Sequence, residues 1–446
     1  MSLIRVIRQT DREALARLLE HLAARSVALD AELMKVVTSI VDDVRARGDQ
    51  ALIEYTARFD KVDLKPSELR ITQNELHRYA AGADERVVRA LREAIRNVRV
   101  FHERQVEESW TIAPADGIRL GQRITPLERV GLYIPGGTAA YPSSVVMNVV
   151  PAQVAGVERI VVTTPPRTLS ENPAVAAALL ELSVTEVYAV GGAQAIAALA
   201  FGTETVPRVD KITGPGNKYV AAAKKLVFGV VGIDSIAGPT EVVIVADETA
   251  RPEFVAADLL AQAEHGEDAS AVLITNSEVL SNEVGREVDR QIESLPRREI
   301  AETSLKQYGA IIIVKTWDDA CSIANELAPE HLEIVTNNDE ALAAKIRHAG
   351  AIFFGAYTPE AVGDYIAGPN HVLPTGRTAR FSSALGVYDF VKRTSLLQYS
   401  EKGFTSVAEK VAVLAECEGL AGHARSALIR EELSSQRRKG AKKTAE

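Results

Sequence analysis

The spacing of apolar residues divides the chain into a helical leader and a longer alternating region. Between residues 11 and 108, apolar positions recur with a period of about 3.6 residues, as in the stripe formed by Leu33, Val37 and Ile40. From residue 128 onward, short β-branched runs alternate with Ala-rich helical segments. This alternation is typical of βαβ units built around a parallel sheet.

The β-branched runs form two series, which the segment SIAGPT at residues 235–240 separates. The first contains RVGLYIP, ERIVVTT, TEVYAVGG and VDKITGPG, and the second contains EVVIVAD, SAVLITN, GAIIIVK, HLEIVTN and GAIFFG. Helical segments lie between the runs of each series, so both predict doubly wound domains. We therefore expect an α/β protein with two doubly wound, incomplete Rossmann-like domains, parallel-rich sheets, and helical N-terminal and C-terminal extensions.

Composition narrows the class of protein. Hydrophobic residues make up 46% of the sequence and charged residues 25%, as expected for a soluble globular protein. Every apolar run is shorter than the roughly 20 residues that a membrane-spanning helix needs, so we expect no membrane association. Charges interrupt the N-terminal segment MSLIRVIRQTDREALARLLEHLAARS, where an export signal needs an apolar stretch, and we therefore predict a cytoplasmic protein.

Net charge and cysteine content limit the partners and the metals. The net charge of -9 argues against general nucleic-acid binding, which needs clustered Lys and Arg. The basic end SQRRKGAKKTAE is interpreted as disordered, solvated chain. The two cysteines, Cys321 and Cys417, are too few for a disulfide framework or a thiolate-rich zinc site. Any metal is therefore expected to have nitrogen and oxygen ligands.

Glycine-rich loops follow the predicted strands of the first series. The loops YIPGG, AVGGAQ and TGPGN each end a strand and open onto a helix, where backbone N–H groups can bind a dinucleotide pyrophosphate. None has the G-x-G-x-x-G spacing, because Tyr219 stands where the third glycine of GPGNKY would be. On pattern alone, tight βα turns explain each loop equally well.

The histidines separate into structural and candidate functional residues. His21, His77 and His102 lie in helical segments among ordinary core and surface residues, which favours structural roles. His265 follows Gln262 by three positions at a helix end, so both side chains project from one face. The two could share a metal or form a helix-end hydrogen-bonding pair. Two further histidines have a carboxylate nearby in the sequence, and the pairs are Asp364 with His371 and Glu418 with His423.

The segment NELAPEHLEIV places Glu330 and His331 between a helix stop and a predicted strand. A histidine there can accept a proton near neutral pH, and the adjacent carboxylate can direct a water molecule or hold a second proton. The alternative is a packed residue at the strand entry with an exposed glutamate beside it. The sequence pattern alone does not separate these two interpretations.

The order of these motifs resembles the histidinol dehydrogenase family. The resemblance runs from DDVRARGDQALIEYTARFD through VGLYIPGG, AGPTEVVIVAD, DLLAQAEHG, APEHL and GDYIAGPNHVLPTGRTARFSS to EGLAGHARS, and so covers nearly the whole chain. Each motif is weak when taken singly. Their common order and spacing are what make the resemblance specific.

The resemblance implies roles for individual residues. The ligands of one zinc ion per subunit would be Gln262, His265, Asp364 and His423. Substrate contacts would add Thr240, His331, His371 and Glu418 to these ligands. The NAD contacts would be Tyr133, Gln194 and Asn217. Serine is also common in the family at position 240, and threonine keeps the hydroxyl.

The reaction implied by the resemblance is the four-electron oxidation of L-histidinol to L-histidine through L-histidinaldehyde, the last step of histidine biosynthesis. His331 would remove the alcohol proton while hydride leaves for NAD, and Glu330 would then activate the water that adds to the aldehyde. A cysteine thiolate is the alternative for the second half. Cys321 lies in an apolar-patterned helix, and the negative charge of Glu418 beside Cys417 would raise a thiol pKa, so neither cysteine favours this route.

The family resemblance also implies a homodimer with composite active sites, in which Glu418 and His423 reach the other subunit. The expected domains are a helical extension at 1–28, an α/β domain with the metal and catalytic residues at 29–125 and 239–380, an NAD-binding Rossmann-like domain at 126–238, and a C-terminal helical segment at 381–446. That last segment would cross to the partner and end in a disordered basic tail.

Two other functions compete with this interpretation. A related zinc-dependent dehydrogenase for another polar alcohol or diol would have a similar metal site and base. A metal-dependent binding or hydrolytic protein would hold no dinucleotide, but it would leave the glycine loops at successive strand ends unexplained.

Overall fold

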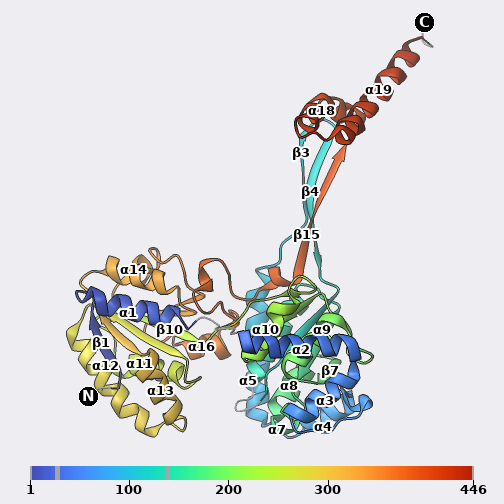
Figure 1. Ribbon diagram of the computed structural model, residues 1–446. Helices are drawn as coiled ribbons and strands as arrows, with labels where there is room; N and C mark the ends of the chain where they lie inside the picture. Colours follow the sequence, from blue (N-terminus) through green and yellow to red (C-terminus); the bar gives the residue numbers. More distant parts are fainter. Residues whose placement is uncertain (1–2, 26–30, 137–140, 444–446) are drawn as a thin grey trace. The chain divides into compact units, whose positions relative to one another are not determined.

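The computed structural model describes residues 3–25, 31–136 and 141–443. The described chain divides into a main unit, from Met1–Val106 and Leu127–Phe390, and a second unit, from Glu107–Pro126 and Val391–Glu446. The main unit contains a first lobe and a second lobe, each built on its own sheet (Figure 1). None of the described helices is both long enough and apolar enough to span a membrane.

The first lobe is built on a sheet with the strand order β2-β7-β6-β5-β8-β9. Its strands are β2 (Arg70–Ile71), β5 (Arg129–Tyr133), β6 (Arg159–Thr164), β7 (Glu186–Ala189), β8 (Lys211–Thr213) and β9 (Gly232–Ile233). All neighbours pair in parallel except β2, which is antiparallel to β7. The predicted strands of the first series are therefore confirmed.

Helices cover both faces of this sheet. They are α2 (Ala31–Arg47), α3 (Asp49–Phe59), α4 (Gln73–Ala80), α5 (Glu85–Glu103), α6 (Pro142–Val154), α7 (Thr168–Glu171), α8 (Pro173–Glu181), α9 (Gly192–Phe201) and α10 (Lys218–Val227), with the short 3-10 helix η1 (Pro66–Glu68). On one face α2 packs against α9 and α10, and on the other α5 and α8 pack against α6 (Figure 1). This burial on both faces explains the continuous apolar strand runs.

The second lobe is built on a sheet with the strand order β1-β12-β11-β10-β13-β14, in which every pair is parallel. Its strands are β1 (Arg5–Arg8), β10 (Glu241–Ala246), β11 (Ser270–Thr275), β12 (Ala310–Ile313), β13 (His331–Val335) and β14 (Ala351–Phe354). The second predicted series is thus confirmed, and β10 begins directly after SIAGPT. The parallel-rich α/β fold predicted from the sequence is confirmed as well.

The second lobe is covered by α11, α12 and α13 on one face and by α1 and α14 on the other. The bounds are α1 (Arg12–Ala23), α11 (Pro252–Ala263), α12 (Glu278–Gln291), α13 (Arg298–Tyr308), α14 (Trp317–Leu327), α15 (Asp339–Ala343) and α16 (Glu360–Tyr365), with the 3-10 helices η2 (Ile292–Ser294), η3 (Thr378–Arg380) and η4 (Val387–Phe390). Helix α14 ends at Leu327 because Ala328 adopts a left-handed conformation and Pro329 follows.

The packing of the leader differs from the predicted domain boundaries. Residues 1–28 were expected to be a helical extension, but β1 pairs with β12 and makes this segment part of the second lobe. Residues 29–125 were expected to accompany 239–380, whereas the apolar stripe of α2 packs against the first-lobe sheet at Val161 and Tyr188. An amphipathic stripe specifies that a face is buried without specifying which sheet buries it, and this is the physical reason for the difference.

The second unit combines strands with the C-terminal helices. Strand β4 (Ile118–Pro126) lies between β3 (Trp110–Ala115) and β15 (Val391–Tyr399) and pairs with both in antiparallel fashion. The helices α17 (Glu401–Thr405), α18 (Ala408–Cys417) and α19 (Ala421–Lys443) follow. The segment 381–446, expected to be helical, therefore also supplies a strand.

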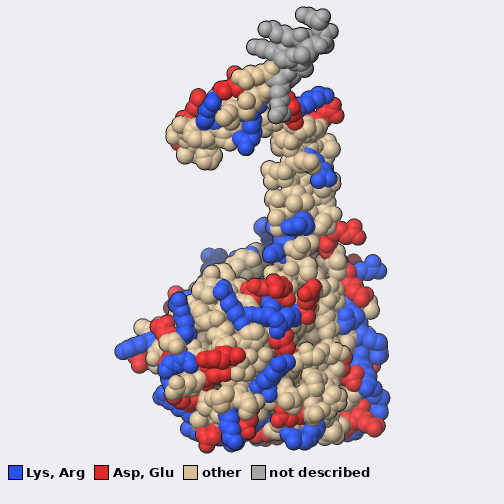
Figure 2. All heavy atoms as spheres, turned by 90° about the vertical axis from the view of Figure 1, so that its right-hand side faces the viewer, with Lys and Arg blue, Asp and Glu red and all other residues tan. Residues whose placement is uncertain are grey.

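The surface differs between the two units. Figure 2 shows Lys and Arg mixed with Asp and Glu over the visible face of the main unit, and few charges along the strands of the second unit. Those strands expose large apolar side chains, since Trp110 is 50% exposed, Ile112 52% and Leu397 72%. An exposed apolar surface of this kind is typical of a protein-contact surface.

Leu332 tests the packing of the strand that carries the predicted base. It is fully buried on β13, so Leu332→Ala should leave a cavity and lower the free energy of unfolding by about 2–5 kcal/mol. Val279→Ala on α12, where the side chain is 65% exposed, serves as the control and should cost less than about 0.5 kcal/mol. Urea unfolding curves compare the two variants, and equal midpoints would contradict the assigned core.

Candidate active site

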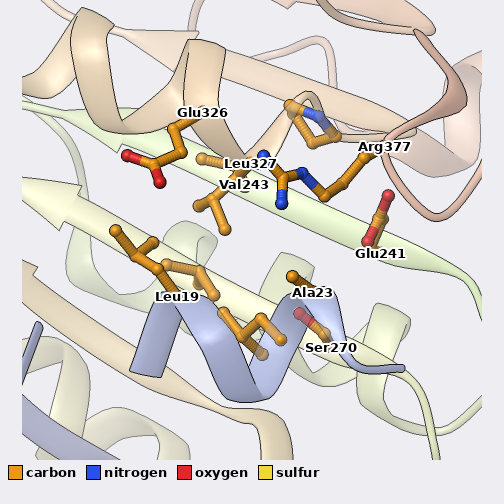
Figure 3. A pocket seen from close by; sticks show the side chains of 11 residues that line it. Leu19, Ala23, Glu241, Val243, Ser270, Glu326, Leu327 and Arg377 are labelled. Atoms are coloured by element: carbon orange, nitrogen blue, oxygen red, sulfur yellow. The ribbon is translucent and has the colours of Figure 1, made fainter. Parts of the chain in front are cut away.

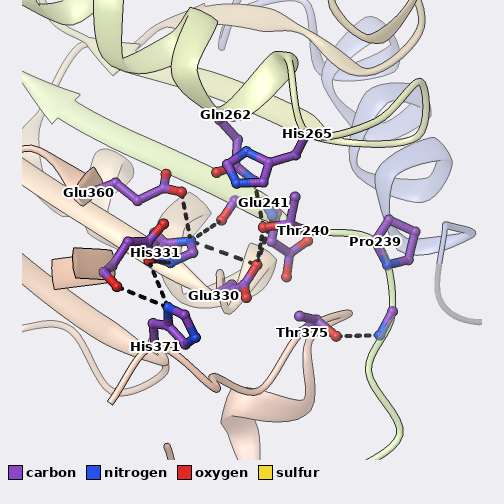
Figure 4. A network of polar contacts seen from close by, with 12 residues as sticks. Pro239, Thr240, Glu241, Gln262, His265, Glu330, His331, Glu360, His371 and Thr375 are labelled. Atoms are coloured by element: carbon purple, nitrogen blue, oxygen red, sulfur yellow. Dashed lines mark hydrogen bonds and ion pairs between the residues drawn. The ribbon is translucent and has the colours of Figure 1, made fainter. Parts of the chain in front are cut away.

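The site begins where two neighbouring strands of the second lobe start. Strands β10 and β13 pair in parallel with Val242 opposite His331, so the residues just before them lie side by side. These residues are Thr240 and Glu330, and Glu241 opens β10. Helix α11 runs from the carboxyl edge of the sheet back to this amino edge, and its C-terminal end therefore brings Gln262 and His265 to the same place (Figure 4).

Glu330 is buried, and most of its contacts come from the start of β10. Its Oε2 accepts a hydrogen bond from the hydroxyl of Thr240 and another, of 3.1 Å, from the backbone N–H of Glu241. Burial raises the pKa of Glu330 to about 8, and the charge of Glu241 adds to this effect, while the bond from Thr240 opposes it. The side chain can therefore hold or release a proton near neutral pH.

His331 is buried beside Glu330 among three carboxylates. Its Nδ1 lies 3.3 Å from the carbonyl oxygen of Glu241, 3.7 Å from Glu330 Oε2 and 3.8 Å from Glu360 Oε1. Its Nε2 is buried, has no hydrogen-bond partner among the described residues, and lies 3.9 Å from Asp364 Oδ1. Burial lowers the pKa of His331 to about 4, so the ring is neutral at pH 7 and able to accept a proton.

The short helix α16 presents Glu360 and Asp364, spaced by one helical turn, to the same cluster. Glu360 is 3% exposed, and its burial together with the charges of Asp364 and Glu330 raises its pKa well above the usual range. The Gln262 amide atom that faces Glu360 lies 2.6 and 2.7 Å from its carboxylate oxygens. With nitrogen in that position the amide donates to the carboxylate. In the reverse orientation the nitrogen donates to Thr240 Oγ1 at 2.7 Å, and the amide oxygen joins the carboxylate oxygens.

One group of side chains has the spacing of a cation site. Ligand atoms of His265, Glu360 and Asp364 all lie within 4.8 Å of one another. His265 Nδ1 is 3.0 Å from the carbonyl oxygen of Ala261, which fixes the proton on Nδ1 and leaves the Nε2 lone pair available. Imidazole nitrogen with carboxylate oxygen suits zinc and similar borderline cations. The group therefore fits a metal.

His371 lies against the other side of Asp364. Its Nδ1 is 3.1 Å from the backbone oxygen of Asp364 and 3.9 Å from its Oδ1, so the loop after α16 folds back onto the helix that it leaves. Burial lowers the pKa of His371, which keeps this imidazole neutral as well. Figure 4 shows the rings of His331 and His371 together with the carboxylates of Glu330 and Glu360.

The main unit thus brings together most of the predicted site residues of the second lobe, namely Thr240, Gln262, His265, Glu330, His331, Asp364 and His371. Glu418 and His423 belong to the second unit, where Glu418 caps the C-terminal end of α18 and His423 lies in the first turn of α19. Both are exposed.

The predicted dinucleotide residues lie at the carboxyl edge of the first-lobe sheet. Tyr133 ends β5, and its hydroxyl accepts a 3.2 Å hydrogen bond from the N–H of Gly192 at the start of α9. Asn217 caps α10, since its Oδ1 accepts from the N–H groups of Tyr219 and Val220 at 3.0 and 3.2 Å. Gln194 is 1% exposed and packs beneath the turn at Gly192.

A cavity of about 860 Å³ joins these two sets of residues. Its walls include Tyr133 and Asn217 from the first lobe and His265, Glu330 and His331 from the second. Gln194 does not line it. The volume suits a substrate together with part of a cofactor.

A second cavity, about 20 Å³ in volume, lies between α1 and the sheet of the second lobe (Figure 3). Its walls are largely apolar, with Leu19, Leu22 and Val243 among them, and Arg377 and Glu241 reach its rim. The space holds about one water molecule. It is too small for a substrate.

Sequence reasoning missed the acidic surroundings of the cluster. Glu360 stands four residues before Asp364, a spacing that places both on one helix face and could have drawn attention to it. Glu333 follows His331 by two residues, and its Oε1 accepts the N–H of Glu360 at 2.8 Å. Glu333 also shares a hydrogen bond with Asp258, and burial raises the pKa of both carboxyls. This pair thus fixes the start of α16.

His102 has the structural role predicted for it. It is fully buried, with Nδ1 2.7 Å from the carbonyl oxygen of Val98 and Nε2 3.4 Å from the amide nitrogen of Asn370. The ring therefore ties α5 to the loop that contains His371, and it lies outside the walls of the large cavity.

The large cavity collects buried acids and imidazoles with shifted pKa values at the ends of parallel strands. These features indicate an α/β enzyme that uses acid–base chemistry. The comparisons with known proteins give the particular family. The model of the family described as histidinol dehydrogenase matches residues 23–431.

Similar proteins agree with that match. The chain is 56% identical over 400 residues to a histidinol dehydrogenase of Geobacillus kaustophilus, covering 90% of this chain and 94% of that protein. It is 55% identical over 401 residues to one of Bacillus subtilis, covering 90% and 93%. The crystal structure of histidinol dehydrogenase from Elizabethkingia anophelis matches with a TM-score of 0.90 at 35% identity, covering 97% of this chain and 99% of that one. The chain belongs to the histidinol dehydrogenase family.

The raised pKa of Glu330 predicts a pH-dependent stability. Between its ordinary value of 4.5 and about 8, the unfolded chain ionises this carboxyl while the folded chain keeps it protonated. Its contribution to stability is therefore present in full below pH 4.5 and lost as pH rises toward 8. Glu330→Gln removes the titration, so on metal-stripped protein the variant should gain stability over the parent from pH 5 to pH 8, on the order of a few kcal/mol.

Thermal unfolding midpoints of parent and variant across this pH range measure the effect. The control is Glu326→Gln, which removes an exposed carboxyl from the neighbouring helix α14. A parallel pH profile for the parent and Glu330→Gln would show that Glu330 ionises normally in the folded protein.

Proposed function

We propose that the protein oxidises L-histidinol to L-histidine through L-histidinaldehyde, with NAD as the oxidant and zinc as the metal, as the last step of histidine biosynthesis in the cytoplasm. The observation that carries this proposal is the contact of the buried Glu330–His331 pair with the cation-type group formed by His265, Glu360 and Asp364. Family membership supports the substrate.

Zinc would be held by Gln262, His265 and Asp364, and by His423 from a second copy of the chain. The bond of His265 Nδ1 to Ala261 and the acid-rich surroundings of Gln262 suit this role. When bound, zinc would hold the imidazole and amine of the substrate and so fix the position of the reacting carbon. Glu360 lies close enough to be a further ligand or a substrate contact.

Residues along the carboxyl edge of the first-lobe sheet would hold NAD, and each of the two oxidations would use one NAD as its hydride acceptor. Asn217 uses its amide oxygen to cap α10, which leaves its amide nitrogen free to donate to the dinucleotide. Tyr133 lines the cavity beside it. Gln194 is assigned with them as a cofactor residue, and its position beneath the turn at Gly192 means that it would act closest to the loop backbone.

The first oxidation needs a base for the alcohol proton. His331 is neutral at pH 7 because burial holds its pKa at about 4, and its Nε2 carries no protein hydrogen bond among the described residues. This nitrogen would take the proton of the substrate hydroxyl as hydride leaves the carbon that bears this hydroxyl. The nearby Asp364 carboxylate would stabilise the imidazolium that forms.

The second oxidation needs a water oxygen as well as a base. Glu330 has a pKa raised to about 8, and its ionised form would accept a proton from water as that water adds to the aldehyde carbon. His331, after releasing the alcohol proton to solvent, would then take the proton of the hydrate hydroxyl during the second hydride loss. His331 would therefore be the proton acceptor in both hydride losses, and Glu330 would be the acceptor in the addition of water.

The remaining substrate contacts would come from Thr240, His371 and Glu418. Thr240 donates to Glu330 and so positions the catalytic carboxyl, and it is one of the residues that line the cavity. The neutral His371 ring also lines the cavity. Glu418 is exposed in the second unit, from which a second copy of the chain would supply it.

We propose a homodimer with composite sites. The second unit exposes Trp110, Ile112 and Leu397 on its strands, a surface that a partner would cover. In such a dimer the exposed Glu418 and His423 would complete the main-unit site of the other subunit.

The nearest alternative is a related dehydrogenase that acts on another polar alcohol or diol. Such an enzyme would share the base and the metal, and it would differ in the residues that recognise an amine and an imidazole. Only the substrate profile separates the two.

The reaction stoichiometry tests the proposal. We expect two NADH and one histidine for each histidinol consumed, followed by absorbance at the nicotinamide band and by amino-acid analysis. Removal of the metal with a chelator should abolish turnover, and added zinc should restore it. NADH formation from another diol but none from histidinol would establish the alternative, and absence of NADH with every alcohol would exclude a dehydrogenase.

Mixing inactive subunits tests the composite site. Glu330→Gln impairs the main-unit part of the site and His423→Asn impairs the contributed part, so a heterodimer of the two has one intact site. Half of randomly exchanged dimers are heterodimers, and about one quarter of the parental activity should return. The control mixes Glu330→Gln with His331→Asn, which impair the same part and should not complement. No recovery after verified exchange would show that each site is made by one chain.

A further inference from the structure

A buried ion pair in the first lobe bears on cofactor binding, given the use of NAD proposed above. Lys224 on α10 and Asp234 just after β9 form an ion pair through Nζ and Oδ1, with side chains that are 3% and 5% exposed. Both residues belong to the walls of the large cavity. The mechanism proposed above uses neither of them.

The pair also binds both polar groups of one residue. The N–H of Gly214 donates to Asp234 Oδ2 at 2.8 Å, and the carbonyl oxygen of Gly214 accepts from Lys224 Nζ at 3.1 Å. Gly214 is the first residue after β8 and opens the loop GPGN. The two charges therefore hold the beginning of the loop that the proposed function assigns to the dinucleotide.

The backbone at Gly214 needs this support. Its φ of +113° is a conformation that side chains rarely allow, and a Cβ there would lie 2.2 Å from the carbonyl oxygen of Tyr133. Gly214 therefore lies close against the end of β5, with no room for a side chain. Asn217 at the other end of the loop caps α10, and α10 carries Lys224 two turns later, so the contacts close a ring.

The ionic character of the contact suggests a role beyond stability. Burying two charges has a large desolvation cost, and apolar residues of similar size commonly stabilise a fold as well or better. Here the charged groups do what apolar groups cannot, because Lys224 donates to the carbonyl oxygen of Gly214 and Asp234 accepts from the N–H of the same residue. We therefore expect the Lys224–Asp234 pair to fix the position of the Gly214 backbone more than to stabilise the fold.

We propose that Lys224 and Asp234 are positioning residues for the dinucleotide, which hold the Gly214–Asn217 loop so that its backbone and the Asn217 amide face the cofactor. Loss of the pair would loosen the loop and weaken NAD binding, while the metal group and the Glu330–His331 pair in the other lobe keep their geometry. The defect should therefore appear in cofactor affinity and not in histidinol affinity.

The variants are Lys224→Met, Asp234→Asn and the double variant. Each single change leaves one buried charge without its partner and is expected to lower the melting temperature as well. The double variant is neutral at this position, keeps an acceptor for the Gly214 N–H, and removes the donor to the Gly214 carbonyl. It separates the effect on the loop from the effect on stability.

The matched control is the pair Lys211 and Asp389. Lys211 begins the same strand, β8, at its opposite end, and its Nζ lies 2.9 Å from Asp389 Oδ1 with side chains 15% and 22% exposed. The pair does not touch the glycine loop. Lys211→Met with Asp389→Asn therefore removes an ion pair from the same lobe without altering the proposed cofactor contacts.

The measurements are NADH binding by fluorescence titration without histidinol, Michaelis constants for NAD and histidinol, metal content and melting temperature, all on the full-length protein. We expect the double variant to recover a melting temperature near the parental value, to bind NADH at least tenfold more weakly, and to keep the histidinol constant and the metal content. The control pair should leave NADH affinity within about twofold.

Parental NADH affinity in the double variant, or an equal loss in the control pair, would overturn the positioning role. The parent protein distinguishes this result from failure of the proposed function. A parent that binds no NADH and forms none from histidinol would overturn the use of NAD, and the loop assignment with it.

Discussion

The burial of Glu330 and His331 is the constraint on which the rest of the site depends. In water a glutamate is ionised near neutral pH and a histidine is partly protonated, so the adjacent pair would carry opposite charges in part of the molecules. Burial reverses the preference of both groups, raising the pKa of the carboxyl and lowering that of the imidazole. The pairing of β10 with β13 produces this burial, because it places the pair between neighbouring strands and beneath α16.

Burial also raises the pKa of two carboxyl groups behind the site, those of Glu333 and Asp258. Glu333 and Asp258 share a hydrogen bond behind the site, and Glu333 also accepts the first N–H of α16. A carboxylate that accepts a backbone donor in a dry interior is held firmly, since the donor would otherwise be left unsatisfied. The orientation of Glu360 and Asp364 is therefore determined by a residue on the same strand as His331, and the possible metal group and the possible base are parts of one scaffold.

The candidate site residues of the two lobes lie at opposite ends of their strands. In the first lobe the glycine loops follow β5, β7 and β8 at the carboxyl edge, as expected for ligand sites in parallel sheets. In the second lobe the cluster precedes β10 and β13 at the amino edge, where α11 returns. Residues from both edges line the large cavity. The first-lobe wall follows the rule that ligands bind at the carboxyl ends of parallel strands, whereas the second-lobe wall exists because α11 returns to the amino edge.

The sequence by itself determined the local features, because each depends on neighbours within a few residues. Apolar runs specified the strands β5 to β8 and β10 to β14 but not β1, β2 or β9. Ala328 and Pro329 ended α14, and the placement of Glu330 and His331 before a strand indicated a site. The tertiary structure alone decided which sheet buries α2, that β1 joins the second lobe, that Gln194 lies beneath a turn, and that Glu360 faces Gln262. These outcomes depend on contacts between segments far apart in the chain. Hydrophobic burial is non-directional, so an apolar stripe on a helix or an apolar strand must be covered, but its sequence does not determine which element covers it.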